Sequence, residues 1–143
     1  MMNWLKKRFK NEKGLTLVEL LAVIVILAIV GTIAFVSIGK IIENSKKDAF
    51  ASDALRMIDA AKLYEANGNE IGDEGVKLET LISEGLIDEF LDPCEKDDVE
   101  TGSVEKDDEG YKVTIKGGGH EISSVDEKTL QKGERDDIFG SDS

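Results

Sequence analysis

Residues 15–38 read LTLVELLAVIVILAIVGTIAFVSI, and this stretch decides the organisation of the whole chain. As an α-helix, about 24 residues at a rise of about 1.5 Å extend about 36 Å, which exceeds the roughly 30 Å of a membrane's hydrocarbon core. A conventional secretory signal has an apolar core of only about 7 to 15 residues and ends at a small-residue cleavage site. This run is longer and unbroken, so it predicts a membrane-spanning helix.

The helical pattern continues beyond the apolar run. Apolar residues recur at spacings of three and four, as expected for one face of an amphipathic helix. They are Ile38, Ile41, Ile42, Phe50, Ala54, Met57, Ile58, Ala61 and Tyr64. Residues 39–66 are therefore predicted to continue the helix, and its end is expected near residues 65–69, where Asn and Gly favour a stop and a turn.

Charge is distributed unevenly along the 143 residues. The first 14 residues carry the basic side chains Lys6, Lys7, Arg8, Lys10 and Lys13 against one acid. The formal net charge is -12, and without residues 1–14 the chain keeps 13 basic and 29 acidic residues, a charge of about -16. Positive residues beside a span favour the cytoplasmic side, so we expect a cytoplasmic N-terminus with the bulk of the chain outside. So acidic a body argues against direct nucleic acid binding through a basic patch.

Glu19 is the single charged residue within the apolar run. An ionised carboxylate at the membrane centre costs about 2.5 to 3.5 kcal/mol on insertion scales. Either Glu19 lies close enough to the cytoplasmic interface to reach water, or it meets a positive partner inside an assembly. The residues alone leave both explanations open.

The segment KGLTLVELL, residues 13–21, resembles the class III signal of type IV pilins, pseudopilins and competence pilins. The shared features are a basic leader, Gly, an apolar residue, Thr, Leu, an aliphatic residue, Glu and a long apolar helix. The resemblance implies that a prepilin peptidase cuts between Gly14 and Leu15 and that the new amine of Leu15 is methylated. It also implies that Glu19 pairs with this amine on a neighbouring subunit.

The resemblance is incomplete at two positions. Leu15 stands where family members most often have Phe, and Val36 stands where many have a helix-bending Pro. Without that Pro, Gly31 and Gly39 are the expected weak points of the helix.

The resemblance implies a structural subunit of a type IV pilus or pilus-like filament, serving adhesion, motility, DNA uptake or protein secretion. Its implied partners are the prepilin peptidase/methyltransferase, other pilin subunits and, indirectly, an assembly platform with its ATPase. The implied location is the cell membrane before processing and the cell surface afterwards. The alternative is a membrane-anchored extracellular binding or adhesion domain that keeps residues 1–14 and never polymerises.

The head, residues 67–125, is predicted to combine a short helix with a three-stranded antiparallel sheet. Leu78, Leu81 and Ile82 have helical spacing and Gly85 suits a C-cap, which predicts a helix over residues 77–84. From residue 103 the apolar period is two, with strands around Val104, Tyr111, Val113, Ile115 and Ile122. Turns are expected at residues 107–110 and 117–119.

These elements predict an α+β, pilin-like fold, in which the sheet packs on the amphipathic part of the long helix. The apolar helix residues expected beneath the sheet are Phe50, Met57, Ile58, Ala61 and Tyr64. The acidic residues 126–143, with Ile138 and Phe139 as their one apolar pair, have the composition of a partly disordered tail.

No motif in the sequence predicts catalysis or a bound cofactor. The lone Cys94 cannot form a disulfide within the chain and is either a free thiol or an intermolecular partner. His120 lacks a catalytic motif and is interpreted as a strand-edge residue. Acidic clusters such as residues 107–109 lack the ligand spacing of a calcium loop, so we expect no metal site, no cofactor and no enzyme activity.

Overall fold

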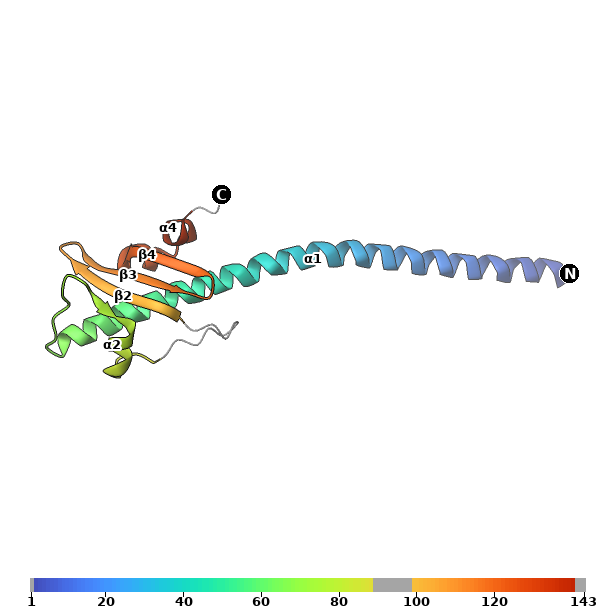
Figure 1. The fold of residues 1–143 in the computed structure, drawn as a ribbon. Helices are drawn as coiled ribbons and strands as arrows, with labels where there is room; N and C mark the ends of the chain where they lie inside the picture. The colour runs from blue at the N-terminus through green and yellow to red at the C-terminus, as the bar shows by residue number, and fades with distance from the viewer. Residues whose placement is uncertain (1, 89–98, 141–143) are drawn as a thin grey trace. The chain divides into compact units, whose positions relative to one another are not determined.

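The computed structural model describes the backbone of residues 2–88 and 99–140, with side chains from residue 16 onward within these ranges. The chain divides into two compact units, Met1–Glu43 and Asn44–Ser143. The expected α+β class is confirmed, because a long N-terminal helix precedes a small antiparallel sheet (Figure 1). The elements are α1 (Met2–Ala66), β1 (Val76–Lys77), α2 (Leu78–Ser83), β2 (Val99–Asp107), β3 (Gly110–Gly117), β4 (His120–Asp126), α3 (Glu127–Lys132) and α4 (Arg135–Phe139).

In the first unit, every side chain described from residue 16 to residue 43 is exposed. The large apolar side chains there keep between 49% and 82% of their surface accessible, the upper value being that of Phe35. The helix is continuous through Gly31 and Gly39. The hydroxyl of Thr32 donates to the carbonyl of Ala28 at 2.8 Å, which satisfies this polar group inside the apolar run. A helical surface this apolar requires lipid or other protein around it.

The second unit begins within α1 and contains all other described elements. The helix ends at Ala66, where the sequence predicts a stop. The amide of Asn67 still donates to the carbonyl of Leu63 at 3.0 Å, and Gly68 then takes a φ of +91°. This left-handed conformation is one that glycine adopts at no steric cost, so the chain turns back there.

The sheet has four antiparallel strands in the order β1-β2-β3-β4, so the prediction of three strands is wrong by one. The extra strand, β1, pairs Val76 with Val104 and Lys77 with Ser103. Two residues are too few to show a period of two, which is why the sequence pattern did not reveal this strand. Gly75 leads into β1 with a φ of +73°, and a Cβ atom there would lie 2.6 Å from the carbonyl oxygen of Val104.

Both predicted turns between strands are present. The pairing of β2 with β3 places Asp107 opposite Gly110, and the pairing of β3 with β4 places Gly117 opposite His120. Strand β2 begins at Val99, earlier than residue 103, where the apolar alternation begins.

The core lies between the sheet and the α1 segment of the second unit, as predicted. From α1, Met57, Ile58 and Ala61 are fully buried, while Phe50 and Tyr64 pack against the core from its margin. The sheet contributes Val104, Val113, Ile115 and Ile122, which are fully buried as well. Each such aliphatic side chain stabilises the fold by about 1.5 to 3 kcal/mol on transfer scales. The amphipathic half of α1 therefore belongs to the head.

Helix α2 covers Leu78–Ser83, one residue shorter at each end than predicted. Leu81 is fully buried and fixes the helix to the core. Gly85 takes a φ of +69° and its amide donates to the carbonyl of Ile82 at 2.9 Å, so the predicted glycine C-cap is confirmed.

The expectation of a partly disordered acidic tail over residues 126–143 is wrong for residues 126–140, and residues 141–143 lie outside the described part of the chain. They form α3 and α4, which bury Leu130 and Ile138 to 3% and 4% exposure. Asp126 caps α3 through its side chain, and Gly133 ends α3 in the left-handed conformation. Composition suggested disorder because the segment is highly charged and has few, widely spaced apolar residues. Nothing in composition alone distinguishes Leu130 and Ile138, the two side chains that anchor the segment in the core.

Candidate functional site

The predicted processing junction, Gly14 and Leu15, lies inside α1 together with the rest of the leader from Met2 onward. A peptide bond within a helix is held in hydrogen-bonded turns, so an enzyme must open the helix locally to reach it. Glycine lowers this cost, because it destabilises a helix interior by roughly 0.5 to 1 kcal/mol relative to alanine. The backbone position of Gly14 is thus suited to local opening.

Glu19 lies four residues after Leu15, one turn along the same helix face. Its side chain is exposed among the apolar side chains of Leu17, Val18 and Leu20, which are 68%, 63% and 59% exposed. It makes no hydrogen bond or ion pair with any other residue that the structure describes. Its charge therefore needs water or a cation from outside the described side chains.

One helix among the described residues is long and apolar enough to cross a membrane. It is the described part of α1, Thr16–Ala66, whose most apolar window has a mean hydropathy of 3.0 and no buried residue. Glu19 lies near the start of this helix.

In the head, Glu65 near the end of α1 joins two residues of the β2–β3 hairpin. Its carboxylate accepts hydrogen bonds from Lys106 Nζ and from the Tyr111 hydroxyl, each at 2.5 Å. The hydrogen bond from Lys106, followed by that from Tyr111, lowers the pKa of Glu65. The same bonds to Glu65 raise the pKa of Lys106 and of Tyr111. The three side chains fix the hairpin to the helix end.

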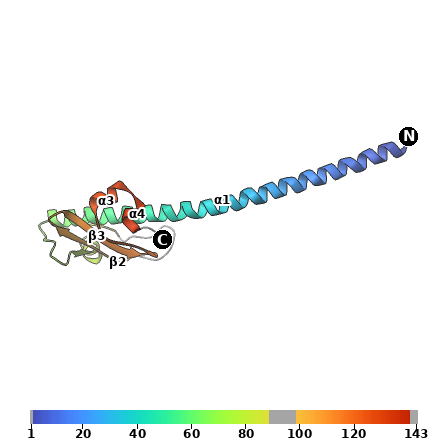
Figure 2. The same cartoon turned by 90° about the horizontal axis from the view of Figure 1, so that it is seen from above.

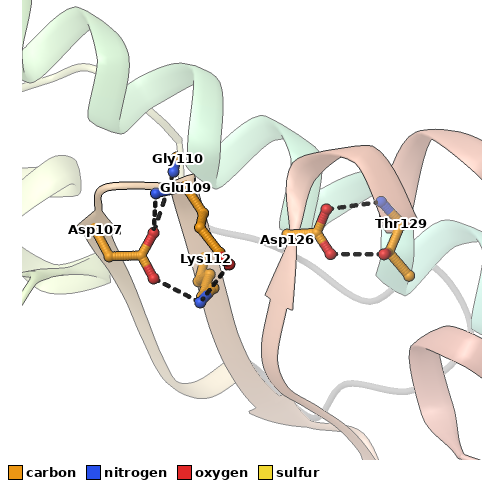
Figure 3. Close-up of polar contacts among 6 residues, drawn as sticks. All are labelled: Asp107, Glu109, Gly110, Lys112, Asp126 and Thr129. Carbon is orange, nitrogen blue, oxygen red and sulfur yellow. Dashed lines mark hydrogen bonds and ion pairs between the residues drawn. The ribbon is translucent and has the colours of Figure 1, made fainter.

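Two further carboxylates organise local backbone in the head (Figure 3). Asp107 accepts from the amides of Glu109 and Gly110 at 2.9 and 3.1 Å and from Lys112 Nζ at 2.5 Å. Asp126 accepts from the Thr129 hydroxyl at 2.6 Å and its amide at 3.3 Å. These bonds lower the pKa of both carboxyl groups, with Lys112 the main cause for Asp107 and the Thr129 hydroxyl for Asp126. Asp107 thus stabilises the turn between β2 and β3.

His120 begins β4, in agreement with its interpretation as a strand-edge residue. Its ring lies 5.9 Å from that of Phe50 and 6.1 Å from that of Phe139, between centroids. Among the described residues, no group of three His, Cys, Asp or Glu side chains could hold a metal ion. Cys94 lies outside the described residues.

Sequence patterns did not reveal the ion pairs that join distant parts of the head. Arg135 binds Asp48 through two hydrogen bonds of 2.8 and 2.6 Å, although 87 positions separate them. Lys62 binds Glu127 at 2.6 Å across 65 positions, and this bond raises the pKa of Lys62. Charged residues are so frequent in this chain that no local signal distinguishes the paired ones.

Comparison with known families gives a match to the prokaryotic N-terminal methylation motif over residues 9–35. The match includes Gly14, Leu15 and Glu19 and ends inside the apolar part of α1. No curated protein and no solved structure matches the chain. Residues 9–35 therefore carry the class III signal, the N-terminal methylation motif that is characteristic of type IV pilins and pseudopilins.

Proposed function

We propose that this chain is the precursor of a structural filament subunit, cut between Gly14 and Leu15 and then polymerised through the apolar part of α1. The methylation motif supports a pilin-like precursor, and the proposal adds the cleavage site and the polymer. A major pilin of a surface fibre and a pseudopilin of a secretion or competence machine would share this physical mechanism. The protein acts by assembly and catalyses no reaction.

Glu19 is the observation that carries the proposal. An exposed acid on an otherwise apolar helix surface is expensive in lipid, at about 2.5 to 3.5 kcal/mol near the membrane centre. A passive membrane anchor gains nothing from it. In a polymer, the methylated amine of Leu15 on a second subunit supplies the missing cation, so the charge favours assembly in one register.

The charge distribution supports a defined orientation in the membrane before assembly. The five basic residues of the leader favour a cytoplasmic N-terminus, where the peptidase/methyltransferase acts. The acidic remainder, at about -16, then lies outside the cell and becomes exposed at the fibre surface. The partners are other pilin subunits, the membrane and, indirectly, the assembly platform and its ATPase.

N-terminal mass spectrometry tests the proposal on protein sheared from the cell surface, with the membrane fraction of the same cells as the control. We expect the sheared material to begin at methylated Leu15 and the membrane fraction to contain some precursor that still carries residues 1–14. A chain that keeps residues 1–14 in every fraction and never enters fibres would refute the proposal. That result would instead favour the membrane-anchored binding domain.

The same fractions separate the two kinds of filament subunit. Abundant processed chain in visible surface fibres identifies a major pilin. Processed chain without visible fibres, combined with loss of DNA uptake or of secretion on deletion, identifies a pseudopilin.

A further inference from the structure

The chain leaves the C-terminal end of α1 through Asn67, Gly68 and Asn69. The β2–β3 turn lies at the same end of the head, because Glu65 at the end of the helix binds Lys106 of β2 (Figure 2). This exit from α1 contains the one Asn-Gly pair of the sequence. Its chemistry is independent of the membrane helix.

The reactivity of an Asn side chain depends on the residue that follows it. The backbone nitrogen of that residue can attack Cγ of the Asn and close a five-membered imide ring. A side chain on the following residue crowds this ring, whereas glycine leaves the approach open and rotates freely. Of the Asn residues after Leu15, Asn44 precedes Ser and Asn69 precedes Glu, so Asn67 is the one that precedes glycine.

The structure leaves the side chain of Asn67 available for this attack. Asn67 and Gly68 are both exposed, and the Asn67 side chain makes no hydrogen bond to any other residue that the structure describes. Gly68 has a φ of +91°, and a Cβ atom placed on it would have no atom within 4 Å. Nothing described therefore encloses the pair, and water can reach an imide ring that forms there.

Asn69 lies two residues further along and is held in place. Its Nδ2 donates to the carbonyl of Tyr64 at 3.1 Å, and its backbone amide donates to the same oxygen at 3.4 Å. Asn69 is also partly buried. These bonds fix its side chain against the end of α1, so Asn69 is an internal control for Asn67.

One hydrogen bond opposes the reaction at Asn67. The attacking amide of Gly68 donates to the carbonyl of Glu65 at 2.9 Å and must release it first. Opening a single hydrogen bond of this kind slows the reaction by about two- to tenfold. This bond lies beyond Ala66, the last residue of α1, and helix ends fray, so a larger cost is not expected.

We propose that Asn67–Gly68 is a site of spontaneous chemical modification in the folded head. The Gly68 nitrogen bonds to Cγ of Asn67, the bond from Cγ to Nδ2 breaks, and ammonia leaves with the amide proton of Gly68. Water then opens the imide ring, either at Cγ to give aspartate or at the backbone carbonyl to give isoaspartate. This inference does not rest on the proposed function, because it needs neither cleavage nor a filament.

The new carboxylate is unfavourable at the position where it forms. It stands at the negative end of the α1 dipole and two residues from the carboxylate of Glu65. The folding equilibrium constant should fall by about two- to fivefold, the range for a charge of the wrong sign at a helix end. Modification therefore loosens the end of α1 as the protein ages.

Peptide mass spectrometry on the full chain in detergent tests the site. Trypsin cuts after Lys62 and Lys77, so one peptide contains both Asn67 and Asn69. After incubation at mildly alkaline pH, we expect fragment ions to show the exchange of NH for O at Asn67 and none at Asn69. A sample digested without incubation sets the baseline. Conversion at neither residue, or at equal rates at both, would overturn the proposal.

The same measurement on the chain unfolded in guanidinium shows what the fold contributes. Asn67 should convert at most about tenfold faster there than in the folded head, because only the Gly68 hydrogen bond protects it. Asn69 should gain more on unfolding, since it loses both bonds to Tyr64. If the folded head protects Asn67 as strongly as Asn69, the inference is wrong.

Matched variants test the attacking atom and the effect of the charge. Gly68→Ala should remove conversion at Asn67, whereas Gly85→Ala, with a similar left-handed backbone and open surroundings, should leave conversion unchanged. Unchanged conversion in Gly68→Ala would exclude attack by the Gly68 nitrogen. In urea unfolding, Asn67→Asp should lower the folding equilibrium constant about two- to fivefold relative to the uncharged Asn67→Ser. Equal constants would refute the loosening of α1.

Discussion

Replacing Gly75 with alanine tests how the short strand β1 is attached to the sheet. A Cβ atom at this position would lie 2.6 Å from the carbonyl oxygen of Val104 and 3.0 Å from Cγ of Glu105. The first contact is with backbone, which cannot move aside as the end of a flexible side chain can. Overpacking of this kind costs about 1 to 3 kcal/mol.

The backbone conformation of Gly75 adds a second penalty. Its φ of +73° lies in the left-handed region, where a side chain costs about 1 to 2 kcal/mol. Gly85 provides a matched control, because it has a similar φ of +69° but no atom within 4 Å of its added Cβ. We therefore expect Gly85→Ala to lose about 1 to 2 kcal/mol and Gly75→Ala about 2 to 5 kcal/mol.

The assay is thermal unfolding of the full chain in detergent, followed by near-ultraviolet circular dichroism. Within the head this signal reports Tyr64 and Tyr111, in addition to Trp4 of the leader, whereas the far-ultraviolet signal would be dominated by the apolar helix in the micelle. For a head of about 100 residues, 1 kcal/mol shifts the midpoint by about 4 to 8 °C, so Gly75→Ala should unfold at least about 4 °C below Gly85→Ala. Equal midpoints for the two variants would refute the argument that the Val104 carbonyl blocks a side chain at Gly75.

Five further outcomes are expected. The lowered pKa of Glu65 means that its ionised carboxylate stabilises the head above about pH 4, and that this stabilisation is lost as the pH falls. Glu65→Gln should therefore lower the stability of the head at neutral pH and make that stability depend less on pH in acid. The raised pKa of Tyr111 means that its protonated hydroxyl stabilises the head below about pH 10. Tyr111→Phe should therefore make the stability of the head depend less on pH in alkali. Urea unfolding midpoints measured across pH check the Glu65 and Tyr111 variants. Asp126→Ala should lower the unfolding free energy by about 1 kcal/mol through loss of the α3 cap, measured by urea unfolding. Glu19→Gln should leave membrane insertion intact but reduce sheared fibre, because the neutral side chain offers the methylated amine no charge. Raising salt from 0.01 to 0.15 M should increase fibre assembly in turbidity assays, because it shortens the screening length from about 30 to about 8 Å between acidic heads.

The sequence was sufficient for the elements with strong periodicity. The apolar run predicted the long helix, and the spacing from Phe50 to Tyr64 predicted its buried face. The alternation around Val113 predicted strands with turns between them. These predictions succeeded because many residues of one element repeat the same preference, so local pattern and tertiary packing agree.

The features that sequence analysis missed depend on contacts between distant residues. Strand β1 exists because Val76 fits against Val104, and α3 and α4 fold because Leu130 and Ile138 find the core. None of these contacts leaves a periodic signal in two to six residues. The proposed processing and assembly residues were inferred differently, through the fixed order of residue types around Gly14 and Glu19, in a segment that matches a known motif.

The exposure of large apolar side chains differs between the two units of the chain. Among the described residues, the exposed large apolar side chains fall between residues 17 and 42, with Leu63 of the head as the one exception. The apolar residues of the head therefore pack into its own core, and its acidic surface repels a second head. In the proposed filament, the attraction between subunits then comes from the first unit, with Glu19 as the residue proposed to set its register. It follows that substitutions in the head core should change head stability before they change polymerisation, whereas Glu19 variants should change polymerisation and leave head stability unaltered.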